Sequence, residues 1–144
     1  MIVITDTNII FSALISPNRK VAEVLNAKSN IQLFVPDFLF EEIDNHLDKI
    51  IKHSNKNKRE ILLEIANFKN RVSIINRIDI PKKDVKKAIS IVNDIDIDDF
   101  LFVALHFYKK HKLWTSDKAL IKGLLKKGYD ICITTEALQK KLYK

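Results

Sequence analysis

Short runs of β-branched and aliphatic residues alternate with stretches of helical periodicity along the whole chain, and this alternation constrains the fold more than any other feature. Such runs predict buried strands. Five strands are expected, at Ile2–Thr5, Gln32–Val35, Val72–Ile75, Leu113–Thr115 and Asp130–Thr134. Strands that alternate with helices predict a mostly parallel sheet with helices on both faces. The sequence therefore predicts an α/β fold with three layers, α/β/α, around a five-stranded, mostly parallel central sheet.

Helical stretches separate these strands. The first runs through Leu14, and the others are expected at Val21–Ala27, 37–52, Arg59–Asn70, Pro81–Val92, Asp98–Lys110 and Lys118–Lys127, before a short helical tail. Residues 100–108 are apolar almost all round, so the helix that contains them is expected to lie buried against the sheet. Such a helix would hold its first residues, Asp98 and Asp99, on a rigid support.

The bulk composition is that of one ordinary domain. The chain has 144 residues, of which 47% are hydrophobic, with two Gly and three Pro. This predicts a single domain over residues 1–144. No apolar run approaches the ~20 residues of a membrane helix, and the N-terminus lacks the basic region of a secretory signal. The lone Cys132 cannot form an internal disulfide and is interpreted as a buried, inert thiol. We therefore expect a cytoplasmic protein without a membrane segment.

The formal net charge of +7 and the pI of about 9.4 indicate a basic surface. A basic surface favours polyanions, nucleic acid first, although a charged face is often merely solvated. The best local basic segment joins two expected helices and contains Lys52, Lys56, Lys58 and Arg59. Contact with substrate phosphates and a plain solvated turn explain this segment equally well.

Acidic residues gather where the expected strands end. Asp6 follows the first strand, Glu42 lies in the helix after the second, and Asp117 follows the fourth. Four more acids crowd the segment before the buried helix: Asp94, Asp96, Asp98 and Asp99. Parallel sheets place ligands beyond the carboxyl ends of their strands, so we expect all these regions at one edge of the sheet.

Several carboxylates at one edge need a partner. Two carboxylates ~5 Å apart repel by roughly 3 kcal/mol at an effective dielectric constant of about 20. A divalent cation relieves that repulsion, and an oxygen-only ligand set suits Mg²⁺ or Mn²⁺. Such a metal can activate water and polarise a phosphodiester. Each acid also has a structural explanation, because Asp commonly caps helices and forms turns, but capping does not account for four acids in one segment.

Periodicity separates the acids of the helix after the second strand. Its apolar stripe contains Leu39, Ile43, Leu47 and Ile50. At about 100° per residue, Glu42 lies roughly 95° from the centre of the stripe and Glu41 roughly 165° away. Glu42 can therefore reach the edge of a cleft while Glu41 faces solvent. Asp44, near the other flank of the stripe, stays an alternative.

At this point the sequence resembles the PIN-domain family of metal-dependent nucleases. Four blocks in order carry the resemblance: Ile2–Asn8, Val35–Ile43, Asp98–Leu105 and Leu113–Leu120. The last block is a strand that ends in Thr-x-Asp. The resemblance spans nearly the whole chain and implies a five-stranded parallel sheet and an Mg²⁺- or Mn²⁺-dependent endonuclease that usually acts on RNA.

The resemblance also implies roles for individual residues. The acids carried over as catalytic and metal-binding are Asp6, Glu42, Asp99 and Asp117. Asp98 would be an auxiliary ligand and Asp96 a weaker candidate. Residues that would orient carboxylates or water are Thr7, Asn8 and Ser116. One departure is His106, where the family usually has a small residue; we interpret it as a satisfied interior histidine.

Partners and competing functions follow from the same comparison. Many small members of the family are toxins of toxin–antitoxin pairs, inhibited by an antitoxin protein, and homodimers are common. A non-catalytic module that binds RNA or protein is the main alternative to an enzyme. An aspartate-based phosphatase is a third hypothesis, but that class usually has a second acid two residues after the first, and Asn8 occupies this position after Asp6.

Overall fold

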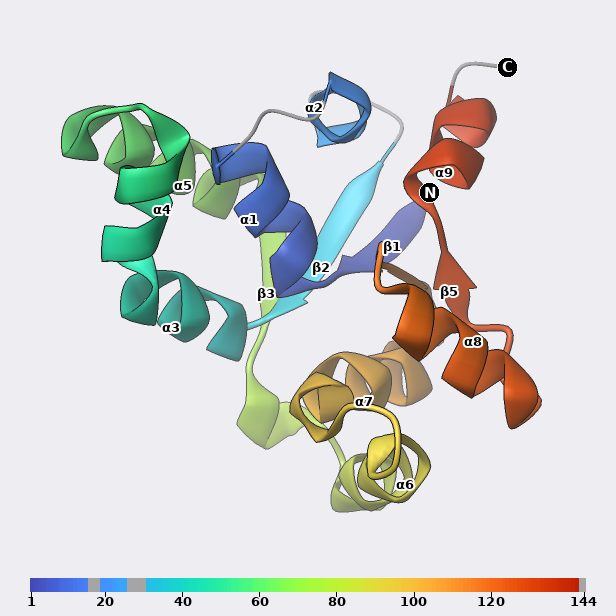
Figure 1. Cartoon of the computed structure of the whole chain (residues 1–144). Helices are drawn as coiled ribbons and strands as arrows, with labels where there is room; N and C mark the ends of the chain where they lie inside the picture. The colour runs from blue at the N-terminus through green and yellow to red at the C-terminus, as the bar shows by residue number, and fades with distance from the viewer. Residues whose placement is uncertain (16–18, 26–30, 143–144) are drawn as a thin grey trace.

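A five-stranded parallel sheet forms the centre of the protein in the computed structural model, which describes residues 1–15, 19–25 and 31–142 (Figure 1). Its strands are β1 (Ile2–Thr5), β2 (Gln32–Pro36), β3 (Val72–Ile75), β4 (Lys112–Trp114) and β5 (Cys132–Ile133). They lie in the order β3-β2-β1-β4-β5, and every neighbouring pair is parallel. The predicted α/β fold with a five-stranded sheet is confirmed.

Helices cover both faces of the sheet. The α-helices are α1 (Thr7–Ile15), α2 (Arg19–Leu25), α3 (Phe38–Asn45), α4 (Leu47–Ser54), α5 (Lys58–Arg71), α6 (Lys82–Val92), α7 (Phe100–Lys109), α8 (Lys118–Lys126) and α9 (Thr135–Leu142). Two 3-10 turns are η1 (Arg77–Asp79) and η2 (Ile97–Asp99). Helices α1 to α5 lie on one face, and α6 to α8 lie on the other (Figure 1). Over the described ranges, no helix has the length and apolarity needed to cross a membrane.

Helix α7 fulfils the expectation from its apolar sequence. It packs against β1, β2 and β4, and six of its residues are buried. The predicted start at Asp98 was wrong, however, because η2 precedes the helix and α7 begins only at Phe100. Asp96 accepts a hydrogen bond from the backbone N of Asp98 at 3.1 Å, which stabilises this tighter turn. Asp98 and Asp99 are therefore held on a 3-10 turn instead of an α-helix.

The helix predicted over 37–52 is divided in two. Residue His46 leaves the helical region, with φ −110° and ψ 12°, so α3 ends at Asn45 and α4 begins at Leu47. No Gly or Pro marks this break, and the residues around it, Asp44 to His46, have low helix propensity. The division leaves Glu42 on a short helix at the carboxyl edge of the sheet. The predicted second helix extends to Ala27, and its residues after Leu25 lie outside the described ranges.

Two polar side chains in the interior have partners. Trp114 is fully buried in the core, and its Nε1 donates to the Thr135 hydroxyl at 3.0 Å. His106 is half-buried, and its Nδ1 donates to the backbone oxygen of His111 at 2.7 Å. The interpretation of His106 as a satisfied interior residue is confirmed. Burial raises the pKa of the Cys132 thiol to about 12, which agrees with an inert thiol.

Candidate metal centre

An acidic pocket opens at the carboxyl edge of the sheet, where β1 ends and α1, α3 and η2 meet. Its lining residues are Asp6, Thr7, Asn8, Glu42, Asp96, Asp98, Asp99 and Phe102. Segments far apart in the sequence therefore converge as the strand-end positions predicted. The pocket holds five carboxyl groups and no Lys or Arg side chain, so its net charge is negative when those groups are ionised.

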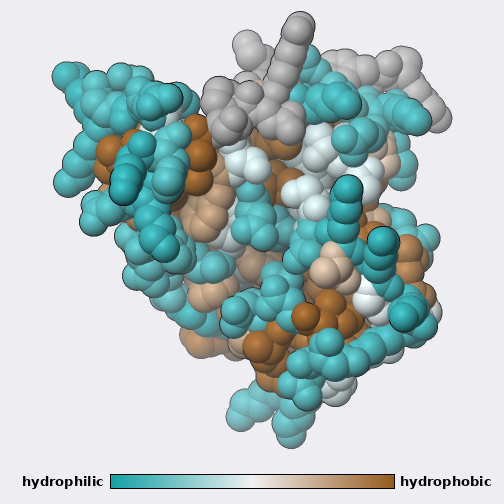
Figure 2. All heavy atoms as spheres, viewed as in Figure 1, coloured by the Kyte–Doolittle hydropathy of each residue, from teal (hydrophilic) through white to brown (hydrophobic). Residues whose placement is uncertain are grey.

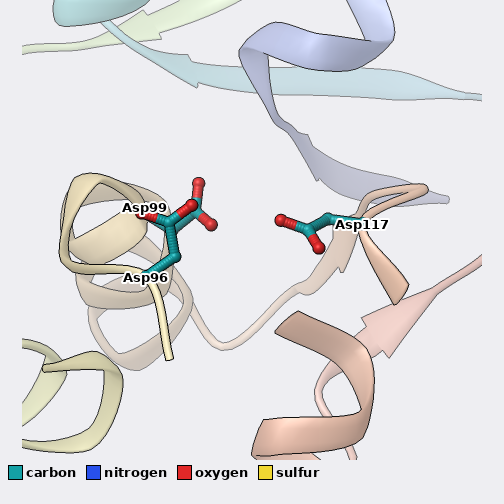
Figure 3. A group of neighbouring side chains, drawn as sticks. All are labelled: Asp96, Asp99 and Asp117. Atoms are coloured by element: carbon teal, nitrogen blue, oxygen red, sulfur yellow. The ribbon is translucent and has the colours of Figure 1, made fainter. Parts of the chain in front are cut away.

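Three carboxylates face one another at the mouth of this region. One oxygen from each of Asp96, Asp99 and Asp117 lies within 4.8 Å of the other two. Asp96 and Asp99 come from the segment before α7, whereas Asp117 points at them from the turn after β4 (Figure 3). Carboxylate oxygens at this spacing can ligate one hard divalent cation.

Asp6 is the most deeply placed acid. It follows the last residue of β1, and its side chain is only 3% exposed. Its Oδ1 accepts a hydrogen bond from the backbone N of Ile9 at 3.0 Å, and the Thr115 side chain provides a second hydrogen bond. Burial raises the pKa of Asp6 to about 6, and the nearby Asp117 adds to the rise, while these two hydrogen bonds oppose it. Asp6 is thus fixed in place, and ionising it without a cation is costly.

Asp99 carries the clearest sign of a missing partner. Burial, together with the charges of surrounding acids, raises its pKa to about 7. Its Oδ2 is buried and has no hydrogen-bond partner within the described part of the chain. Buried polar atoms are nearly always paired, because leaving one unpaired costs roughly 1–3 kcal/mol. A hard cation bound between Asp99 and Asp117 would supply the partner, so these residues fit the Mg²⁺ or Mn²⁺ that the oxygen-only set predicts.

Glu42 reaches the pocket from α3. It is half-buried, and the Thr7 hydroxyl donates a hydrogen bond of 2.6 Å to its Oε1. Burial raises the pKa of Glu42, and the Thr7 bond lowers it. Glu41 instead faces solvent and forms an ion pair with Arg77, and Asp44 is exposed. Of the three acids weighed for this helix, Glu42 is the one that lines the pocket.

Asp117 combines two roles that the sequence presented as alternatives. Its Oδ1 caps α8 by accepting from the backbone N of Leu120 at 3.1 Å. Its carboxylate also belongs to the group formed with Asp96 and Asp99. The backbone N of Asp117 donates to the Thr115 hydroxyl at 3.1 Å. Thr115 therefore touches both Asp6 and Asp117; the sequence analysis did not single it out, although it is the Thr of the Thr-x-Asp block.

The structure changes the emphasis among the neighbouring acids and polar residues. Asp96, the weaker candidate, belongs to the three-carboxylate group, whereas Asp98 lines the pocket with an exposed side chain outside that group. Asn8 and Ser116 are exposed and line, with Asp117, a second hollow beside the first.

The predicted basic segment lies apart from these acids. Lys52, Lys58 and Arg59 are exposed, and Lys56 pairs with Glu64 at 2.7 Å. These residues lie in or beside the turn between α4 and α5, which is at the end of this helix pair away from α7 (Figure 1). Any phosphate contact there would involve a part of the substrate distant from the acidic pocket.

Comparison with known families covers nearly the whole chain. Residues 4–142 match the family model of the PIN domain. No curated protein matches the chain. The matched range begins within β1 and ends with α9, so it contains part of β1, the other four strands and every acid of the pocket.

Proposed function

Because this chain belongs to the PIN-domain family, whose members are typically nucleases, we propose that it is an endonuclease that hydrolyses RNA phosphodiester bonds with Mg²⁺ or Mn²⁺. The observation that carries the proposal is the buried, unpartnered Oδ2 of Asp99 beside the carboxylates of Asp96 and Asp117. A folded chain tolerates such an arrangement when a cation completes it.

The acidic residues of the site have two proposed roles, which are to ligate the ion and to supply a fixed negative charge beside it. Asp96, Asp99 and Asp117 would hold the ion, since their oxygens are mutually close. When bound, a divalent cation supplies positive charge beside the phosphodiester and lowers the pKa of water. Hydrogen bonds from Ile9 and Thr115 would hold the Asp6 carboxylate in a fixed position, where its negative charge contributes to the pocket.

Glu42 is the group that we propose moves the proton. Thr7 holds Oε1, and Oε2 would accept a hydrogen bond from the attacking water. Its raised pKa brings it closer to neutrality, where a general base works best. Phosphate charge on the substrate would be met by the cation and by the exposed lysines of a chain with net charge +7.

The test is cleavage of a panel of structured and single-stranded RNAs, with DNA of the same sequences, in EDTA, Mg²⁺ and Mn²⁺. We expect cleavage of RNA only with metal, and a loss of at least about 100-fold in Asp99→Asn or Glu42→Gln. Asp44→Asn is the matched control, because it removes an exposed acid from the same helix as Glu42. Metal-independent cleavage, or full activity in Asp99→Asn, would refute the proposal; binding of RNA without cleavage would favour a non-catalytic module.

A narrower role rests on the family resemblance alone. In it the protein is the toxin of a toxin–antitoxin pair, acts as a homodimer and is inhibited by an antitoxin protein. Growth arrest upon expression, absent in Asp99→Asn, is the expected result. Normal growth with active enzyme would remove the toxin role and leave the nuclease intact.

A further inference from the structure

The candidate metal centre is built from two separate halves. Asp96 and Asp99 belong to the segment that links α6 to α7, whereas Asp117 is the N-cap of α8 (Figure 3). The chain between Asp99 and Asp117 passes through α7 and β4, so no short covalent link fixes the two halves at ligand distance. The acids also repel one another when no cation is bound. Some other contact must hold residues 94–99, called the acidic segment below, against α8.

The first such contact is at Gly123, in the middle of α8. A Cβ on Gly123 would lie 2.6 Å from Cδ1 of Ile95 and 2.8 Å from its Cγ1, which is closer than these atoms can approach. Glycine inside a helix costs about 1 kcal/mol relative to Ala, so its presence needs a reason. The reason here is close approach, because the missing side chain leaves a notch that Ile95 fills. Ile95 comes directly before Asp96, so the notch positions the start of the acidic segment.

The second contact is at Lys127, immediately after α8. Its Nζ donates to the backbone oxygen of Ile91, near the end of α6, and forms an ion pair with Asp94. The ammonium therefore joins the C-terminal end of α6, where the helix dipole favours a positive charge, to residues 94–99. Figure 2 shows a hydrophobic area where the end of α6 meets α8, framed by hydrophilic side chains. Apolar packing and a charged link thus act on the same segment.

We propose that Gly123, Ile95 and Lys127 form a clamp that sets the separation of the two halves of the metal centre. They are positioning residues, since none of them belongs to the three-carboxylate group. This inference rests on the proposed metal-dependent function. It assigns to α8 a second task beyond its cap at Asp117, which is to fix the opposite half of the site.

The clamp predicts opposite effects on stability and metal binding. In Gly123→Ala, the new methyl displaces Ile95 and moves Asp96 away from Asp117, so the Kd for Mn²⁺ should rise about tenfold. The metal-free protein should be as stable as wild type or more stable, because Ala favours the helix and the segment relaxes away from its repelling neighbours. Amide exchange across residues 93–99 should become faster. A substitution that only damaged packing would lower stability instead.

Two matched controls belong to the same helix end. Gly128→Ala changes the only other glycine; Gly128 has φ +87° and open space around its Cβ position, so strain should lower stability without changing the Kd for Mn²⁺.

Lys127→Met should raise the Kd for Mn²⁺ and Lys127→Arg should restore it, whereas Lys126→Met, at an exposed neighbour, should have no effect. The double variant Ile95→Ala/Gly123→Ala removes the clashing atoms and should bind Mn²⁺ more tightly than Gly123→Ala alone.

Mn²⁺ affinity is measured by calorimetry on the full-length protein without RNA, so the outcome does not depend on cleavage. If wild type binds Mn²⁺ and both Gly123→Ala and Lys127→Met bind it equally well, the clamp is refuted and the proposed function stands. If wild type binds neither Mn²⁺ nor Mg²⁺, the proposed function fails and the clamp fails with it. A raised Kd with faster exchange in residues 93–99 and unchanged stability supports the clamp.

Discussion

Thr7 and Glu42 are joined by a hydrogen bond of 2.6 Å, although 35 positions separate them in the sequence. Thr7 opens α1 two residues after the end of β1, and Glu42 is on α3, which follows β2. The bond therefore couples two neighbouring strand ends and directs one glutamate oxygen before any substrate arrives.

Thr7→Val tests this coupling. The substitution keeps the shape of the side chain and removes the hydroxyl, so the pKa of Glu42 should rise further. Stability should fall by about 1 kcal/mol, the usual worth of a hydrogen bond to a partly exposed carboxylate. NMR titration of Glu42 and urea denaturation measure the two effects. Thr7→Ser, which retains the hydroxyl, should behave like wild type; a Glu42 pKa unchanged in Thr7→Val would contradict the coupling.

Stability without metal should fall as the pH rises from about 4 to about 7. Burial raises the pKa of Asp6 to about 6 and that of Asp99 to about 7, from an ordinary value of 3.8. Across this window the folded protein binds more protons than the unfolded chain, so deprotonation favours unfolding; below it both states are protonated and the penalty disappears. For the buried Asp6 the effect is on the order of 2–3 kcal/mol.

Urea denaturation in EDTA at pH 5 and pH 8 checks this dependence. Asp6→Asn should lose less stability than wild type between the two pH values, because it removes one of the groups responsible. Mn²⁺ should also reduce the loss, since the ion binds the deprotonated acids. The explanation fails if Asp6→Asn and wild type show the same pH dependence in EDTA.

Asp96 and Asp98 should differ in their effect on metal binding. Asp96 belongs to the three-carboxylate group and Asp98 does not, so Asp96→Asn should raise the Kd for Mn²⁺ about tenfold and Asp98→Asn by less than about threefold. Asn at position 96 can still accept the hydrogen bond from the backbone of Asp98, so η2 should survive. Calorimetry on the two variants decides the question, and the reverse ranking would restore Asp98 as the ligand.

The basic segment should matter only for long substrates. Lys58 and Arg59 are exposed at the end of α4 and α5 that is remote from the acidic pocket. If they contact RNA phosphates, Lys58→Gln/Arg59→Gln should reduce the slope of log affinity against log salt by about 1.4 on a long RNA. The kcat on a short oligonucleotide should not change. The control of equal charge is Lys82→Gln/Lys83→Gln on α6. If this control changes the slope of log affinity against log salt by the same amount, the segment at Lys58 and Arg59 has no specific role in RNA binding.

The sequence predicts the fold well because its signals are local. The run Ile2–Thr5 is a strand in both prediction and structure, and the apolar residues after Asp99 form the buried helix α7. Asp6 and Asp117 come close after β1 and β4, and parallel strands end at one edge of the sheet; α3 and η2 bring Glu42 and Asp99 to the same edge. Whether Glu42 and its fellow acids act as catalytic ligands is still a prediction.

Features that depend on contacts between distant parts of the chain could not be predicted from the sequence. The break at His46 has no Gly or Pro to announce it. The choice between Asp96 and Asp98 depends on the 3-10 geometry of η2, and Thr115 reaches Asp6 only because β1 and β4 are neighbours. The notch at Gly123 acquires its meaning from Ile95, which comes from another part of the chain.

Thr115 uses its single hydroxyl twice. Its oxygen accepts a hydrogen bond from the backbone N of Asp117, and its hydroxyl donates a hydrogen bond to the Asp6 carboxylate. One side-chain oxygen thereby links the acid that follows β1 to the acid that follows β4. Replacing Thr115 would disturb both Asp6 and Asp117. A phenotype observed after that replacement therefore cannot be ascribed to either aspartate alone.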